Sequence, residues 1–268
     1  MEFETILYEV DRQAHQALIT LNNPEKLNAI SRPMMRDILD VCEEIQNDDD
    51  VWVAIWTGAG RGFCSGAQVG AGPRPAVDED TLLNELIEEE TWISRQGKAL
   101  YGVDKPMIAA VNGVAAGAGY SLALCCDIRV GSENAAFVTV YSERNLPPEG
   151  GMSYMLPRIV GMGKAMDLLL TSRRIDAQEA YRIGLLERLV APDMLLPEAF
   201  KIAERICEIP PGAVRITKRT VRKSMDADFS QATVFETLGG KLTRQTPKDA
   251  AESRAAFIEK RKPKFSGR

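Results

Sequence analysis

The sequence predicts an α/β core that extends to about residue 195 and a C-terminal region composed of helices. Continuous apolar runs of strand length stand at "VWVAIWTG" and "PMIAAVNG", as expected of strands that are covered on both faces of a sheet. Segments with helical spacing separate the predicted strands, and this alternation indicates a sheet built from crossover connections. From about residue 161 onward the segments have helical spacing without a sign of a further buried strand.

Each element has its own local signal. Alternating residues at 4–10 and 15–21, separated by the turn-like "DRQAH", predict a hairpin. The segment "SRPMMRDILDVCEEIQNDD" predicts a helix, because Ser31 can cap its first turn and apolar residues recur at helical spacing. A helix over residues 117–126 and a strand at "DIRVGS" follow the two buried strands. The helices expected in the C-terminal region cover residues 163–172, 176–184, 193–208, 212–225, 229–244 and 247–261.

The bulk composition is that of a globular protein. The chain has 268 residues, of which 45% are hydrophobic and 26% charged, and its formal net charge is −5. The acidic balance argues against nucleic acid as a partner, since phosphate binding needs clustered lysine and arginine. No apolar run reaches the ~18 residues that span a bilayer, and the acidic N-terminus resembles neither a signal peptide nor a transit peptide. We therefore expect a cytoplasmic protein without a membrane partner.

Cysteine and histidine usage excludes several kinds of site. The five cysteines form an odd set without a C-x-x-C pair, which disfavours a disulfide framework or a zinc site and fits a reducing compartment. His15 is the only histidine, and its alternating surroundings predict a position on the surface of a strand. A Ser-His-Asp or Cys-His triad and a centre with several histidine ligands therefore lack the residues they need. We expect no metal site.

Two glycine-rich turns, "TGAGRGFCSGAQ" and "NGVAAGAGYSLALCCD", follow the buried strands. A dinucleotide-binding fingerprint is disfavoured, because Gly62 comes one position too early after Gly58 and Gly60, and the second turn lacks its third glycine and the following acid. Glycine turns can instead point backbone N–H groups at a carbonyl oxygen and form an oxyanion hole. Such a site needs only one or two carboxylates beside it, which this chain can supply.

Five segments together resemble the enoyl-CoA hydratase/isomerase, or crotonase, family. They are "NNPEKLNAIS", "GRGFCSGAQV", "KPMIAAVNGVAAGAGYSLALCCDIRV", "GMSYMLPRIVGMGKAMDLLLTSRRIDAQEAYRIGLLERLV" and "AAFIEKRKPKF", and they occur in the family's order over essentially the whole chain. The resemblance implies a crotonase-like ββα spiral core with the acyl-CoA site in residues 1–195 and a helical C-terminal trimerisation region in residues 196–268. It also implies an acyl-CoA thioester as substrate, a role in lipid or aromatic acid metabolism, and assembly into homotrimers or hexamers.

The resemblance also implies site residues, one by one. The "SGAQ" turn would supply the first N–H of the oxyanion hole from Ala67, and the "GAG" turn the second from Ala118, to within one residue. Family members commonly have aspartate where this chain has Gln68, so the usual polar contact is altered there. Residues implied to line the substrate site are Ser65, Gly66, Gln68, Gly117, Gly119, Ser121 and Tyr141, and those implied to bind CoA are Lys26, Ala29 and the tail residue Lys260, which could belong to a neighbouring subunit.

The acids decide which reaction the resemblance implies. Ordinary hydratases of the family hold a water with two glutamates, but this chain has Ser121 and Tyr141 at those positions. Neither side chain can replace a carboxylate as a general base at neutral pH, because serine is not a base and the pKa of tyrosine is ordinarily about 10. The second correspondence assumes that "AAFVTVYSERN" is read without a gap, and a shift of two residues would bring in Glu143 instead.

Glu149, eight residues after Tyr141 in "PPEGG", is the carboxylate with a plausible place in the pocket. It is similar to the working acid of dienoyl-CoA isomerases, of ring isomerases of the phenylacetate pathway and of aromatic-acyl-CoA dehalogenases. Dehalogenation is disfavoured, because that variant also needs a histidine and a tryptophan near the site. The alternative is a purely structural role for Glu149 as an acid at the start of a helix. Its interaction with the helix dipole would stabilise the helix by about 0.3–1 kcal/mol.

The sequence therefore predicts an acyl-CoA isomerase that shifts a double bond or rearranges an unsaturated or cyclic acyl-CoA, with Glu149 as acid and base. No cofactor is expected beyond the coenzyme A of the substrate. Two alternatives stay open: a hydratase or hydrolase in which Glu149 directs water, and a family member without catalysis that binds CoA or RNA. Residues 71–100 are expected to shape the acyl pocket.

Overall fold

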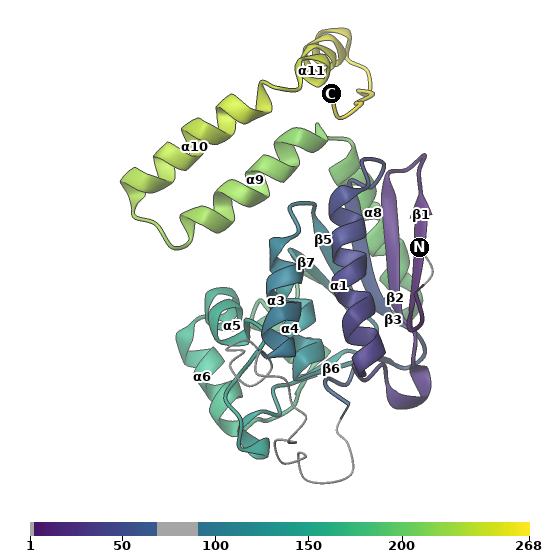
Figure 1. Cartoon of the computed structure of the whole chain (residues 1–268), viewed down its shortest axis with the longest axis vertical. Coiled ribbons are helices and arrows are strands. Elements are labelled where there is room, and N and C mark those ends of the chain that lie inside the picture. The colour runs from purple at the N-terminus through teal and green to yellow at the C-terminus, as the bar shows by residue number, and fades with distance from the viewer. Residues whose placement is uncertain (1–2, 69–90) are drawn as a thin grey trace, which may run out of the picture.

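The computed structural model describes residues 3–68 and 91–268, and Figure 1 shows an α/β core from which a pair of long helices extends. The larger sheet is six-stranded, and all its neighbouring strands are parallel except the antiparallel first pair. Its strands, in order across the sheet, are β1 (Ile6–Asp11), β2 (Gln16–Leu21), β3 (Val53–Gly58), β5 (Met107–Val111), β7 (Ile128–Ser132) and β10 (Arg188–Val190).

A second, smaller sheet stands next to the first. Its strands, in order, are β4 (Gly62–Cys64), β6 (Val114–Ala116), β8 (Ala136–Val138) and β9 (Ile175–Asp176). After a short turn, β3 is followed by β4, β5 by β6, and β7 by β8, so that the chain passes three times from the larger sheet to the smaller one. This repeated ββα path is the crotonase-like spiral core that the resemblance implies.

Helices surround both sheets. They are α1 (Arg32–Asn47), α3 (Trp92–Gly102), α4 (Ala118–Cys125), α5 (Met152–Val160), α6 (Met162–Thr171), α7 (Ala177–Arg182), α8 (Leu195–Cys207), α9 (Pro211–Ser224), α10 (Phe229–Thr243) and α11 (Pro247–Glu259), with short 3-10 turns at η1 (Pro24–Lys26), η2 (Ser142–Arg144) and η3 (Pro192–Met194). In the described ranges 3–68 and 91–268, no helix is long and apolar enough to cross a membrane.

The larger sheet is covered on both faces, which explains its continuous apolar strands. In β3, Ala54 and Trp56 belong to the main core with α1, whereas Val53 and Ile55 pack against Ala199 and other residues of α8. Successive residues of a strand point to opposite faces, so a strand with two covered faces has no polar alternation. Ser31 caps α1 as predicted, since its side chain accepts a hydrogen bond from the N–H of Met34.

Two expectations from the sequence are wrong. The region after residue 161 does contain strands, β9 and β10, which are too short to show a hydrophobic period. His15 does not lie on a strand but in the turn before β2, with a φ of 57°. Its ring stacks on Trp52 with centroids 3.8 Å apart. The predicted hairpin, the three predicted strands and the predicted helices are all present, with ends that differ by a few residues.

Candidate active site

The first glycine turn leaves β4 and passes beside the segment that precedes α1. The N–H of Ile30 donates to the carbonyl of Gly66 over 2.8 Å, and the N–H of Gln68 donates to the carbonyl of Ile30 over 2.9 Å. This is a parallel β-bridge between Ile30 and Ala67. Because the bonded groups flank Ala67, its own N–H points away from Ile30. The N–H is therefore directed toward the other side of the turn.

The second glycine turn connects β6 with α4. Gly117 precedes the helix with a φ of 48° and a ψ of −119°, a conformation that only glycine adopts readily. Its carbonyl accepts the N–H of Ser121 over 2.9 Å, the first bond of the helix. The N–H of Ala118 stands in the first turn, where helix N–H groups have no partner within the helix. The positive end of the helix dipole lies at the same place.

The two turns are in direct contact. A Cβ atom added to Gly66 would lie 2.6 Å from the carbonyl oxygen of Ala116 and 3.4 Å from the nitrogen of Ala118. A Cβ atom added to Gly119 would lie 2.3 Å from the carbonyl oxygen of Cys64. Only glycine fits at these places, so the sequence brings two N–H-bearing turns together backbone to backbone. N–H groups arranged in this way can stabilise one developing oxyanion.

A buried asparagine side chain holds the first turn, and sequence reasoning missed it. Asn28 is fully buried, and its amide donates to the carbonyls of Ala59 and Gly62 over 3.0 and 2.8 Å. Its Oδ1 accepts the N–H of Asn23 over 2.9 Å. Asn28 has a φ of 56°, which asparagine tolerates better than most residues. The one available sequence signal was an asparagine inside the turn-rich "NNPEKLNA".

The predicted CoA-binding residues are only partly brought together. The carbonyl of Lys26 accepts a hydrogen bond from the Oγ of Ser65 over 3.1 Å, so the turn from Lys26 to Ala29 lies against the first glycine turn. Lys260 is exposed at the end of α11. Figure 1 shows α11 at one end of the molecule and β6 near the other. One chain therefore does not bring Lys260 to the two glycine turns.

The backbone of Glu149 is held between α3 and α4, and the residue itself is half-buried. Its carbonyl accepts a hydrogen bond from the Oγ of Ser121 over 2.8 Å. Gly150 follows with a φ of 65°, and a Cβ atom there would lie 3.0 Å from the Cβ of Ser121. On the other side, a Cβ atom on Gly97 of α3 would lie 2.7 Å from the carbonyl oxygen of Gly150. Two glycines thus allow both helices to approach this segment closely.

Tyr141 is buried beside Ser121, with its Oη 3.4 Å from the Oγ of Ser121. The single proton of Ser121 is directed to the Glu149 carbonyl, so Tyr141 is the donor in the contact between the two hydroxyls. Burial raises the pKa of Tyr141 to about 12. Glu143, in contrast, is exposed in η2. The structure therefore places a neutral phenol, and not Glu143, against Ser121.

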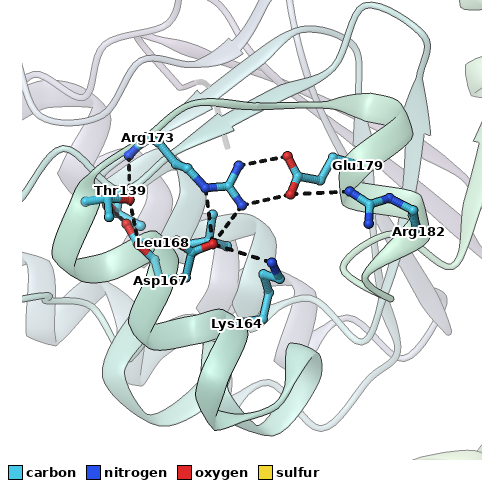
Figure 2. Close-up of polar contacts among 8 residues, drawn as sticks. Thr139, Lys164, Asp167, Leu168, Arg173, Glu179 and Arg182 are labelled. Atoms are coloured by element: carbon cyan, nitrogen blue, oxygen red, sulfur yellow. Dashed lines mark hydrogen bonds and ion pairs between the residues drawn. The ribbon is translucent and has the colours of Figure 1, made fainter.

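Hydrogen bonds to α6 hold the segment that carries Tyr141. Thr139 donates from Oγ1 to the carbonyl of Leu168 over 3.1 Å, as Figure 2 shows, and Ser142 donates from Oγ to the carbonyl of Leu169 over 2.7 Å. Between them, Val140 has a φ of 58°, which is rare for a β-branched residue and costs about 1–3 kcal/mol. The two contacts with α6 hold this strained backbone in place.

An arginine in turn fixes the end of α6 (Figure 2). Arg173 donates to both oxygens of Glu179 in α7 over 2.8 Å, and to Oδ2 of Asp167 in α6 over 2.8 and 3.2 Å. Lys164 and Arg182 complete the cluster. Arg173 lowers the pKa of both Asp167 and Glu179, because its charge and hydrogen bonds favour the ionised carboxylates. This cluster therefore ties α6 to α7.

The remaining predicted residues have these positions. Gln68 is exposed at the last described position before residue 69, and Gly119 is buried in the first turn of α4. The predicted acyl pocket, residues 71–100, falls partly outside the described residues, since 69–90 are not among them. Residues 92–100 lie in α3, which contacts Gly150 as described above.

The model of the enoyl-CoA hydratase/isomerase family matches residues 11–268. The chain belongs to the enoyl-CoA hydratase/isomerase family. It is 37% identical over 268 residues to a probable enoyl-CoA hydratase of Mycobacterium leprae, with both sequences covered completely. An enoyl-CoA hydratase from Bacillus anthracis superposes with a TM-score of 0.88 at 30% identity, covering 99% of this chain and 100% of that one. A monofunctional enoyl-CoA isomerase from M. smegmatis superposes with a TM-score of 0.72 at 35% identity, covering 85% of this chain and 97% of that one.

Membership of the enoyl-CoA hydratase/isomerase family confirms the resemblance and the fold class. The chain has the crotonase fold and is an enzyme of a family whose members are named as hydratases and as isomerases. An acyl-CoA thioester is consistent with that family.

Proposed function

We propose that this family member is an acyl-CoA isomerase in which Glu149 is the acid and base. The observation that carries the proposal is the pairing of Ser121 with Tyr141 beside the Glu149 backbone. Both hydroxyls are neutral, and both are engaged with protein groups. Among the catalytic and substrate-lining residues that the resemblance implies in the described ranges 3–68 and 91–268, Glu149 is thus the one carboxylate, since Glu143 is exposed in η2.

The reaction follows from the two glycine turns and one carboxylate. The N–H groups of Ala67 and Ala118 donate to the thioester oxygen, which acidifies the proton next to the carbonyl or at the far end of a conjugated double bond. The carboxylate of Glu149 takes this proton, and the electron pair moves into the enolate. The neutral acid then returns the proton to another carbon of the acyl group, so the double bond moves and Glu149 is regenerated.

Isomerisation suits this pocket better than hydration. Addition of water requires a group that positions the water and removes a proton from it. Ser121 is not a base, and its proton is directed to the Glu149 carbonyl. Tyr141 is not a base below pH 10 either, because burial raises its pKa to about 12. A single proton that shuttles on Glu149 needs neither of them.

A second candidate is a hydratase or hydrolase that acts on an unsaturated or cyclic acyl-CoA, with Glu149 directing the water. The names of relatives favour it, since the M. leprae and B. anthracis proteins are named as hydratases. A family member that binds CoA or RNA without catalysis is a third candidate, motivated by Ser121 and Tyr141 at the positions of the hydratase acids.

The remaining proposals concern coenzyme A, assembly and location. We place CoA along the turn from Lys26 to Ala29, and require no other cofactor. Lys260 would reach a phosphate of a substrate bound to another copy of the chain.

A homotrimer or hexamer is supported by exposed apolar side chains on the two extended helices, which are Val221, Phe229, Val234, Leu238 and Leu242. The five cysteines, all in the described part of the chain, are unpaired, which supports a cytoplasmic location.

Turnover in water labelled with heavy oxygen tests the proposal. A panel of straight-chain, branched and cyclic enoyl-CoAs is incubated with the enzyme, and the products are followed by mass spectrometry. An isomerase yields a product of unchanged mass in which the double bond has moved. A faster reaction that gives a labelled hydroxyacyl-CoA, or labelled free acid, would overturn the proposal in favour of the hydratase or hydrolase. Tight binding of acyl-CoA without turnover of any thioester would support the third candidate.

A further inference from the structure

Arg222, on α9, binds the ends of two helices of the core. Its guanidinium donates to the carbonyl of Tyr101, in the last turn of α3, and over 3.1 Å to the carbonyl of Cys125, the last residue of α4. It also lies over the Tyr101 ring, 4.2 Å from the centroid. Carbonyl groups at a helix C-terminus lack partners within the helix, and a cation there interacts favourably with the helix dipole. Arg222 therefore caps α3 and α4 at once.

Its orientation is fixed by a half-buried acid. Asp127 accepts a hydrogen bond from Arg222 through Oδ1 over 2.8 Å, and its Oδ2 accepts from Lys218 over 2.6 Å and from the N–H of Met107 over 2.8 Å. The side chain of Arg222 is 14% exposed and that of Lys218 8%. A planar guanidinium held in this way presents its N–H groups in fixed directions.

The two capped helices are those that hold Glu149. Ser121 of α4 donates to the Glu149 carbonyl, and Gly97 of α3 packs against the carbonyl of Gly150. Cys125 connects the two directly, because its own carbonyl binds Arg222 while its Sγ lies 3.8 Å from the carbonyl oxygen of Gly150. The path from Arg222 to the residue after Glu149 thus passes through one buried side chain.

The helix that follows Glu149 is held from the same place. Asp226, just after α9, accepts a hydrogen bond from the hydroxyl of Tyr154 over 2.9 Å and one from Arg158 over 3.2 Å. Both residues belong to α5, and the Tyr154 ring meets that of Tyr101 edge to face at 6.1 Å. The end of α9 therefore contacts α3, α4 and α5, the three helices around Glu149.

We infer that Arg222 is a positioning residue for Glu149, through which the C-terminal helices set the place of the acid–base carboxylate. Its removal frees the ends of α3 and α4, and the Glu149–Gly150 segment can then shift. Displacement of a reacting group by about 1 Å is enough to lower turnover by about 100-fold. The inference rests on the proposed role of Glu149.

The test compares Arg222→Gln with Arg219→Gln. Arg219 is a matched control, because it also joins α9 to the core through an ion pair, with Asp104, but it binds neither helix-end carbonyl. We expect Arg222→Gln to lower kcat on an isomerisable enoyl-CoA by about 10- to 100-fold with little change in KM. Arg219→Gln should stay within about threefold of the wild type. Equal kcat values for the two folded variants would overturn the inference.

Arg222→Lys covers the case in which Arg222→Gln does not fold. Lysine keeps the charge beside Asp127, but its single ammonium group cannot reproduce the fork that reaches two carbonyls. We expect a folded variant, by circular dichroism and gel filtration, with kcat reduced by about 3- to 10-fold. Wild-type kcat in folded Arg222→Lys would contradict the positioning role.

A double-mutant cycle separates this inference from the proposed function. If Arg222 acts through Glu149, the loss caused by Arg222→Lys should vanish in the Glu149→Gln background, because no working carboxylate is left to misplace. An equal loss in both backgrounds would show that Arg222 has a general structural role and would overturn the inference. Full turnover by Glu149→Gln alone would instead contradict the proposed function.

Discussion

The Oγ of Ser121 donates a hydrogen bond to the main-chain carbonyl of Glu149 over 2.8 Å. The bond joins the first turn of α4, which begins at the proposed oxyanion hole, to the backbone of the proposed acid. A fixed distance between the two is what a proton transfer next to a polarised carbonyl requires.

Replacement of Ser121 by alanine should lower kcat by about 3- to 10-fold and leave KM nearly unchanged. The estimate corresponds to the loss of one hydrogen bond, worth about 0.5–1.5 kcal/mol, from the geometry of the transition state. Ser224→Ala serves as the control, because that hydroxyl binds only the carbonyl of Thr220 within α9. Steady-state kinetics on the best enoyl-CoA of the panel checks the prediction. An unchanged kcat in Ser121→Ala would show that the hydrogen bond from Ser121 to Glu149 does not contribute to turnover.

Tyr141 should stay protonated far above neutral pH. Burial raises its pKa to about 12 in the folded protein, against an ordinary value of 10.0. Between pH 10 and 12 the unfolded chain therefore loses the phenol proton while the folded protein keeps it. The contribution of Tyr141 to the free energy of unfolding is thus complete below pH 10 and declines as the pH rises. The absorbance at about 295 nm, compared between wild type and Tyr141→Phe, isolates the titration. A Tyr141 signal with its midpoint near pH 10 in the folded protein would contradict the buried position.

Gly66→Ala should damage the oxyanion hole. Its Cβ atom would lie 2.6 Å from the carbonyl oxygen of Ala116, and Gly66 has a φ of 90°, so the two turns must separate. Loss of one oxyanion-hole donor lowers kcat by about 100- to 1,000-fold in enzymes that use such a hole, and we expect a loss of that order. Gly163→Ala in α6 is the control, since a Cβ atom there meets nothing within 4 Å. Comparable kcat values for the two folded variants would exclude the proposed hole.

The cluster around Arg173 should stabilise the protein in a pH-dependent way. Arg173 lowers the pKa of Asp167 and Glu179, so their stabilising contribution is present above their ordinary pKa values of 3.8 and 4.5 and is lost as the pH falls. Arg173→Gln should therefore lower the Tm by about 2–4 °C at pH 7. The difference from the wild type should shrink below about pH 4. Thermal unfolding at both pH values measures it, and a difference that grows on acidification would contradict the assignment.

The larger sheet and most of the helices could be predicted from the sequence, because these elements depend on local patterns. The apolar runs of β3 and β5 and the capping Ser31 are visible in a short window of sequence. The strands of the smaller sheet have two or three residues each, and segments of that length carry no period. They are formed by the path of the chain between neighbouring turns rather than by their own composition.

The site was predictable only in part, for a similar reason. The glycine turns could be located from their motifs, but the place of Glu149 depends on contacts with Ser121 and Gly97, which are 28 and 52 residues away in the chain. Arg222 could not be found at all, because the carbonyls that it binds lie 97 and 121 residues earlier. Such pairings are properties of the folded backbone, and a single sequence does not display them.

The most direct test of the central claim compares Glu149→Gln with Glu143→Gln. Glutamine keeps the shape of the side chain and removes its capacity to accept and return a proton. We expect Glu149→Gln to bind acyl-CoA normally, by calorimetry, and to lose at least about 100-fold in isomerase kcat, while Glu143→Gln stays within about twofold of the wild type because Glu143 is exposed. Isomerase turnover that survives in Glu149→Gln, or disappears in Glu143→Gln, would contradict the assignment of Glu149 as the acid–base residue.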